Sequence, residues 1–213
     1  MKKIGLGLVL MNFLAAFTPV FASSAADQLL PLLNNVSSMK ADFTQTIFDN
    51  HDRAVQKSFG TLALSRPGKF RWDVKKPMPQ LIIANQSRLW IYDPDLEQVT
   101  IRSFKAASSD TPALLLSHPD AKLNQDYVVT TIQRKPASLQ WFSLKPRNPD
   151  NLFEEVQLGF KAAQISEMRL VDHLGHTTQI EFTNIQTNPS LSPALFVFKA
   201  PNSQVDVIDE TKQ

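Results

Sequence analysis

The sequence predicts a mainly β protein with two helical segments and about eleven short antiparallel strands, arranged as one sandwich or barrel. Two observations carry this prediction. Apolar residues alternate with polar ones over runs of six to ten residues, and turn-forming residues separate these runs at the spacing typical of antiparallel sheets. Two segments with helical character interrupt the pattern, one before the strands and one in the middle.

The predicted strands share a period of two and end at Pro, Gly, Asn or Asp. They cover about 41–48, 57–65, 69–74, 80–85, 88–93, 97–102, 127–133, 138–145, 153–160, 164–172 and 177–186. The run at 177–186 alternates cleanly, whereas those at 80–85 and 88–93 are apolar on both faces. Strands of that kind are covered on both sides, or turn one face toward a cavity. A curved sheet with helices over its concave face and a two-layer core with nothing inside both remain open.

The first helix is expected from apolar residues at helical spacing between Leu29 and Met39, with Asp27 near its start. Pro31 is compatible with this helix only in its first turn. A second, short helix is expected to begin at Ser108–Pro112, continue through Leu114 and Leu115, and stop at His118–Asp120.

Residues 1–22 have the pattern of a secretory signal peptide: Lys2 and Lys3, an apolar run, and small residues before Ser23. We therefore expect residues 23–213 to form a single domain in the periplasm. The whole chain carries a net charge of +2, and both surplus charges lie in the leader, so a global preference for nucleic acid has no support.

No set of catalytic or metal-binding residues stands out. The chain has no cysteine, and no nucleophile elbow or phosphate-binding loop occurs. His173 and His176 flank a turn, where polar residues gather for structural reasons. We expect no enzyme activity, no cofactor and no metal.

The aromatic residues suggest either a packed core or a cavity for an apolar ligand. Phe70 and Trp72 share one face of a strand, Trp90 and Tyr92 share a face of another, and Trp141 lies in a third.

Several motifs, in the same order along the chain, resemble the LolA family of outer-membrane lipoprotein carriers. The segment Gly60–Trp72 resembles the family signature. The other matching segments are Phe43-Thr44-Gln45, Leu89–Pro94 with Glu97–Thr100, Thr111–Leu116, and the ending with Phe196, Phe198, Pro201 and Val205–Ile208. The turn Asn85–Arg88 departs from the family pattern because it lacks a glycine.

The resemblance implies an unclosed antiparallel β-barrel of eleven strands with a helical lid over an apolar cavity. It also implies a monomeric periplasmic chaperone that accepts lipoproteins from an inner-membrane ABC transporter and delivers them to an outer-membrane receptor. Arg66 matches the arginine that ties the lid to the barrel, although by itself it reads as an ordinary strand-end residue. We expect Phe70 at the rim, on the same strand as Arg66, and Leu114 and Leu115 in the lid. Trp72, Trp90, Tyr92 and Trp141 are the further candidates for contact with acyl chains.

Three other functions are alternatives to the lipoprotein carrier. The outer-membrane receptor of the same pathway is itself a lipoprotein and needs a cysteine that this chain lacks. For an enzyme that acts on lipid or on the cell wall, the sequence offers no nucleophile, general base or metal-binding residues in a recognisable arrangement. A periplasmic regulator that senses lipids or lipoproteins with the same fold is the alternative that remains, although such sensors usually carry a further domain.

Overall fold

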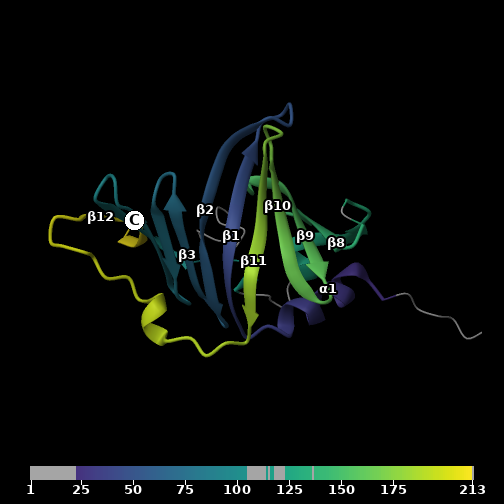
Figure 1. Cartoon of the computed structure of the whole chain (residues 1–213), viewed down its shortest axis with the longest axis horizontal. Coiled ribbons are helices and arrows are strands. Elements are labelled where there is room, and N and C mark those ends of the chain that lie inside the picture. The colour runs from purple at the N-terminus through teal and green to yellow at the C-terminus, as the bar shows by residue number, and fades with distance from the viewer. Residues whose placement is uncertain (1–22, 105–113, 115, 118–122, 136, 213) are drawn as a thin grey trace, which may run out of the picture.

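A computed structural model of the chain describes residues 23–104, 114, 116–117, 123–135 and 137–212. Its main element is a single twelve-stranded sheet (Figure 1). The strands are β1 (Ser38–Phe48), β2 (Ala54–Ser65), β3 (Lys69–Lys76), β4 (Gln80–Ala84), β5 (Arg88–Asp93), β6 (Gln98–Ser103), β7 (Tyr127–Ile132), β8 (Gln140–Pro146), β9 (Phe153–Lys161), β10 (Gln164–Asp172), β11 (Thr177–Thr187) and β12 (Asp206–Asp209). The helical elements are α1 (Ala25–Asn34), α3 (Leu123–Asp126), η2 (Pro193–Phe196) and η3 (Glu210–Lys212).

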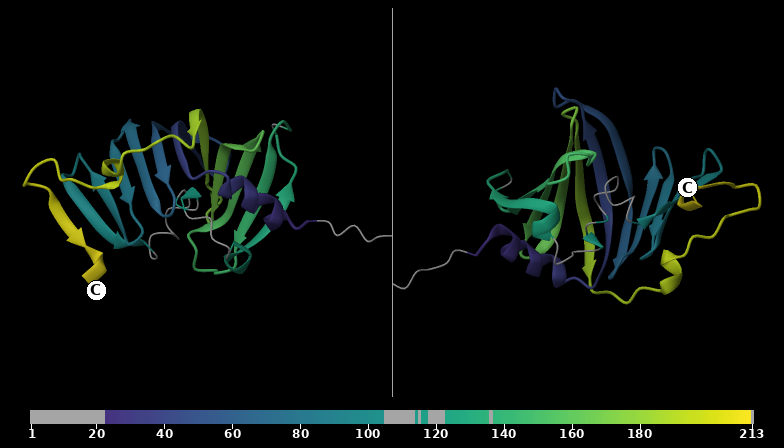
Figure 2. Two further views of the ribbon diagram at one scale, coloured as in Figure 1. Left: turned by 90° about the horizontal axis from the view of Figure 1, so that it is seen from below. Right: turned by 180° about the vertical axis from the view of Figure 1, so that it is seen from behind.

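The sheet order is β12-β6-β5-β4-β3-β2-β1-β11-β10-β9-β8-β7, so the first strand of the chain lies in the middle. Neighbouring strands are antiparallel except β12 and β6, which are parallel. Within the described residues β7 and β12 form the two edges, and the sheet curves without closing (Figures 1 and 2). The predicted unclosed antiparallel barrel is therefore confirmed, and β12 adds one strand to the eleven that the sequence pattern predicted.

Helix α1 is capped by Ser24, the residue before its first turn, whose hydroxyl accepts a hydrogen bond from the backbone N–H of Asp27 at 3.1 Å. The Asp27 carboxylate accepts in return from the Ser24 N–H at 3.2 Å, which completes a capping box. Two expectations about this helix are wrong. It ends at Asn34, so Met39 belongs to β1, and Pro31 lies inside the helix rather than in its first turn. A proline there costs roughly 3 kcal/mol, which the burial of Leu29 and Leu33 on the inner side offsets.

The hydrophobic core lies between the inner face of the curved sheet and the helical segments. Directly paired residues of neighbouring strands share a face, and one such row joins Leu64, Phe70, Ala84 and Leu89. Phe43 stacks on Trp72 with ring centroids 3.7 Å apart and an interplanar angle of 15°. The two halves of the sheet meet at the centre, where Phe43 pairs with Phe182. Figure 1 places α1 at the lower ends of β9, β10 and β11.

The segment between β6 and α3 is described only in part. The leader prediction (1–22) and most of the second predicted helix, including Leu115, lie outside the described residues. Leu114, Leu116 and Ser117 are described and are all buried.

Candidate functional site

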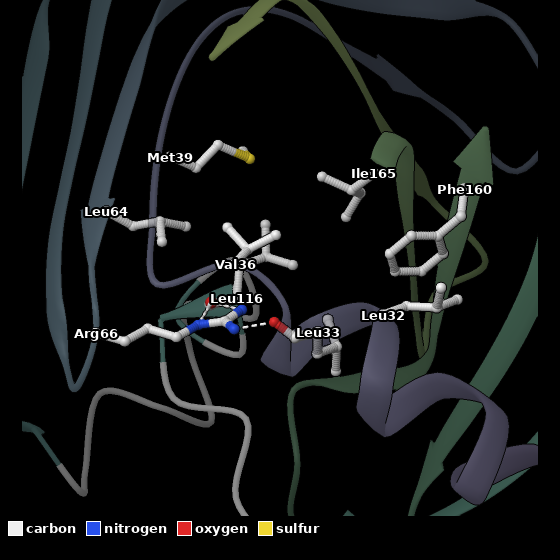
Figure 3. Close-up of a pocket in the computed structure, with 9 residues that line it drawn as sticks. All are labelled: Leu32, Leu33, Val36, Met39, Leu64, Arg66, Leu116, Phe160 and Ile165. Carbon is white, nitrogen blue, oxygen red and sulfur yellow. Dashed lines mark hydrogen bonds between the residues drawn. The ribbon is translucent and has the colours of Figure 1, made fainter. Parts of the chain in front are cut away.

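Arg66 joins two segments that cover the inner face of the sheet. It lies one residue beyond the end of β2 and donates to Leu116 O from Nε at 3.0 Å and from Nη2 at 2.7 Å. Its Nη1 donates to Leu33 O, a carbonyl at the C-terminal end of α1 (Figure 3). One guanidinium therefore connects the end of β2 both to α1 and to the turn around Leu116.

This turn is attached to the sheet at a second point. The N–H of Gly68, in the turn between β2 and β3, donates to Ser117 O at 3.0 Å. Within the turn, the N–H and the hydroxyl of Ser117 donate to Leu114 O at 2.9 and 2.8 Å. Leu114, Leu116 and Ser117 thus form a compact unit that Arg66 and Gly68 attach to the sheet. We call α1 together with this unit the lid.

The environment of Arg66 suits a reversible attachment. Burial lowers the pKa of its guanidinium to about 10, so the side chain stays charged near neutral pH. Both of its acceptors are neutral backbone carbonyls rather than carboxylates. Hydrogen bonds from a charged donor are stronger than neutral ones, but the cost of desolvating the guanidinium offsets part of their energy. The attachment is therefore moderate in strength.

Arg66 also lines a small cavity between the lid and the sheet. The cavity is lined by nine residues, of which Arg66 is the one charged member: Leu32, Leu33, Val36, Met39, Leu64, Arg66, Leu116, Phe160 and Ile165 (Figure 3). Its volume is about 20 Å³, enough for roughly one water molecule. An acyl chain does not fit unless the lid moves, because lid leucines fill the space inside the sheet.

Two of the predicted site residues lie on the inner face. Trp72 stacks between Phe43 and Phe70, with the Phe70 and Trp72 ring centroids 6.2 Å apart. The expectation of a rim position for Phe70 is wrong, because its side chain is fully buried in this lid-closed state. Phe70 is also on β3, across the turn from Arg66 and not on the same strand. Leu114 is buried in the core as expected for a lid residue.

Trp90 and Tyr92 lie on the outer face of the sheet, away from the core and the lid. On β5, Leu89 pairs with Ala84 on the inner face, so strand alternation turns Trp90 outward, where it pairs with Ile83. The C-terminal segment around η2 covers this region: Phe198 lies 5.6 Å from Tyr92, ring centroid to centroid. The two aromatics therefore lie on the face opposite the lid, and their contact with acyl chains stays a prediction.

Trp141 is also on the outer face. It pairs with Gly159, whereas its neighbour Phe142 pairs with Leu158 on the inner face. A Cβ on Gly159 would lie 2.9 Å from the Trp141 ring, so the indole packs flat over this glycine. The guanidinium of Arg134 lies 5.8 Å from the ring centroid. Trp141 therefore packs against the wall of the sheet, and its contact with cargo stays a prediction.

Part of the site comes from elements that are distant along the chain and that the sequence pattern did not bring together. Phe160 and Ile165 flank the β9–β10 hairpin and face α1 across the cavity. On α1 and after it, Leu32, Leu33 and Val36 complete the lining. The apolar stripe of the first helix was visible in the sequence and could have suggested the α1 residues.

The histidines near the β10–β11 turn have structural partners. A ring nitrogen of His173 lies 2.8 Å from Asn151 O, and Nδ1 of His176 lies 2.9 Å from a carboxylate oxygen of Asp172. Among the described residues there is no group of three or more His, Cys, Asp or Glu side chains placed to hold a metal ion. Of the helices that the structure describes, none has the length and apolar character needed to cross a membrane.

Comparisons with known proteins agree with this architecture. Residues 34–199 match the family described as "Outer membrane lipoprotein carrier protein LolA". The chain is 39% identical to an outer-membrane lipoprotein carrier protein of Dechloromonas aromatica over 92% of this chain and 93% of the relative. It is 37% identical to a protein of the same name from Azotobacter vinelandii, over 95% and 97% of the two chains.

Solved structures share the fold at low sequence identity. A LolA superfamily protein from Nitrosomonas europaea superposes with a TM-score of 0.50 at 10% identity, over 83% of this chain and 99% of that one. An uncharacterized conserved protein from Thermus thermophilus gives 0.57 at 10% identity, over 88% and 100%. The family match spans most of the chain and its relatives match over nearly their whole length, so this chain belongs to the LolA family of outer-membrane lipoprotein carrier proteins.

Proposed function

We propose that this chain is a periplasmic lipoprotein carrier whose interior shelters acyl chains once the lid moves. The observation that carries the proposal is the lid itself: α1 and the Leu114–Ser117 turn fill the inner side of an open apolar sheet, and Arg66 holds both. The names of the relatives support lipoprotein as cargo. We further propose that an inner-membrane ABC transporter supplies the cargo and that an outer-membrane receptor takes it.

The energetics suit a carrier that must release its cargo. Burying one methylene contributes about 0.8 kcal/mol, so a sixteen-carbon acyl chain approaches ~12 kcal/mol if fully buried. Opening the lid uncovers leucines that are now almost completely buried: Leu29, Leu33, Leu114 and Leu116. At about 1.5–3 kcal/mol each, their exposure costs roughly 6–12 kcal/mol. The free energy gained by burying the cargo and the free energy lost by opening the lid are therefore of similar size. Loading and release can then both occur when the partners differ only modestly in their affinity for the cargo.

A release assay tests the proposal. Spheroplasts displaying newly made lipoproteins are mixed with the purified protein, which the producing cell has exported and processed. We expect lipoproteins to appear in the soluble fraction in a stable complex with this chain. The Arg66→Leu variant is compared with Arg88→Leu, because Arg88 is exposed at the start of β5 and lies outside the lid.

Two outcomes count against the proposal. No soluble complex, with folded protein and spheroplasts that release lipoproteins to a known carrier, would favour the regulatory sensor instead. Release that occurs equally well with protein whose lid is locked to the sheet by an engineered crosslink would show that the interior is not used.

A further inference from the structure

The sheet is split between β10 and β11 at the end nearest α1. From Val171 with Thr177, next to their connecting turn, these strands pair as far as Glu167 with Glu181, and the pairing stops there. Both continue beyond the last pair: residues 164–166 precede it on β10, and 182–187 follow it on β11. Each continuation is still paired on its other side, with β9 and β1 respectively. Figure 1 shows the two ribbons separating toward their lower ends.

Irregularities occur in both strands at the split. On β10, Ser166 is an extra residue between the pairs that Ile165 and Glu167 make with β9. On β11, Asn184 and Ile185 together stand opposite Ala41. Asn184 has a φ of 50°, and its amide donates to the Asp42 carboxylate at 2.7 Å, which fixes this conformation. Bulges bend a strand and interrupt its pairing, so the split is built into the flanking strands.

A groove of about 340 Å³ occupies the split. Its outer walls are mostly polar, with Lys161, Gln164 and Ser166 on one side and Thr183 and Asn184 on the other. The volume is within the range of specific ligand sites, about 300–1,000 Å³. The side chain of Gln164 donates to the hydroxyl of Thr187 at 3.1 Å, a hydrogen bond that crosses between the two continuations.

The groove adjoins the apolar interior. Phe182, which belongs to the hydrophobic core, and Ile185, which packs against it, are also groove residues. The β9–β10 hairpin is shared between the two spaces: Phe160 and Ile165 face the cavity under the lid, and Lys161 and Gln164 line the groove. A ligand with its apolar end inside the sheet would therefore have a short exit through the split.

We propose that the groove holds, as an added strand, the extended peptide segment that directly follows the acylated residue of the cargo. This inference rests on the proposed function. A strand of three residues is about 10 Å long, which matches the three residues of β10 that are not paired with β11, Gln164–Ser166. Each strand directs alternate backbone N–H and C=O groups to either side, so both walls present hydrogen-bonding groups to an entering chain. Hydrogen bonds between backbones do not depend on which side chains the bound peptide carries, and this suits a carrier with many cargoes.

The test compares two synthetic ligands. One is a diacylglyceryl-cysteine amide without peptide, and the other is the same lipid followed by a flexible ten-residue peptide. We expect the peptide to tighten binding about tenfold, the effect of a few net backbone hydrogen bonds. Methylation of alternate peptide nitrogens should abolish the gain. The variant Thr183→Trp fills the groove and should lose the gain while still binding the lipid alone, whereas Thr130→Trp, exposed on the outer face of the edge strand β7, should keep it.

The outcomes separate this inference from the proposed function. Failure to bind even the lipid alone would contradict the carrier function. Equal affinity for the lipid with and without the peptide would refute only the proposal that the groove binds the peptide. Should Thr183→Trp fold poorly, a photo-crosslinking residue at Gln164 replaces it and should capture the peptide, with Val55 as the exposed control position. Capture in cells of a transporter or receptor subunit at Gln164, with cargo peptide absent, would assign the groove to that partner and refute our inference.

Discussion

Replacement of Arg66 by leucine should weaken the closed state of the lid by an amount that the structure allows us to bound. The change removes three charged N–H···O contacts to two carbonyls, those of Leu116 and Leu33. Hydrogen bonds to a charged group contribute about 1.5–3 kcal/mol each. They share one donor group, and burial lowers the pKa of that guanidinium to about 10, a sign of desolvation that opposes them. A net loss of about 2–4 kcal/mol follows, and this raises the open population roughly 30- to 1,000-fold.

Hydrogen exchange measures this change directly. Amides in the last turn of α1 should exchange faster in Arg66→Leu than in the wild type by a factor within that range, while amides in the central strands β1 and β2 change little. Cargo should also leave the variant more slowly, because reclosure of the lid helps to expel it. Arg66→Lys should be intermediate, since a single ammonium replaces a fork that reaches two carbonyls.

Two results would refute this reasoning. Equal exchange in α1 of the wild type and Arg66→Leu would mean that apolar packing alone holds the lid. Discharge of lipoprotein to the receptor at the wild-type rate would mean that lid closure plays no part in release. Arg88→Leu controls for the loss of a positive charge at the surface.

The remaining predictions concern the sheet and its turns. Ala163→Gly should raise the melting temperature, because alanine holds a φ of 64° in the β9–β10 turn, a left-handed conformation that costs about 1–2 kcal/mol without glycine; an unchanged or lower temperature in thermal unfolding would contradict this. Gly60→Ala should destabilise the fold by about 1–3 kcal/mol in denaturant titration, since its Cβ would lie 2.3 Å from Asp73 O. For Asp172, partial burial raises the carboxyl pKa, but hydrogen bonds from the His176 side chain and nearby backbone outweigh it and lower the pKa below 3.8. The wild type should therefore exceed Asp172→Asn in stability above that pH, and the difference should vanish as the pH falls through the folded-state pKa; a difference that does not shrink as the pH is lowered below 3.8 would contradict this.

Most of the strand arrangement could be predicted because period-two alternation and turn residues are local signals. The run predicted at 164–172 coincides with β10, and the one predicted at 88–93 coincides with β5. The first helix was extended too far because Val36 and Met39 fit both a helical and a strand period at that point. β12 was missed because its four residues alternate little and pair only with β6, a strand about 100 residues earlier.

The assignment of faces could not be made from the sequence. Alternation shows that Trp90 and Tyr92 share a face, but not which face looks inward. The apolar outer face of β5 suggested a cavity, yet its cover is the C-terminal segment with η2 and Phe198, which has no periodic pattern to reveal it. Arg66 was found only through the family signature, since its acceptors come from residues 33 and 50 positions away along the chain.

The central place of β1 has a consequence for how the protein forms. Its partner β11 is among the last elements of the chain, and the Asn188 side chain that accepts from the Ser37 N–H is 151 residues distant. Such contacts impose a large loop-closure cost and slow folding. The hairpins β2–β3 and β4–β5 can assemble early, but the curved wall is completed only when β11 arrives. Because β11 follows all the other strands except β12 along the chain, the interior can form only after nearly the whole sequence is available.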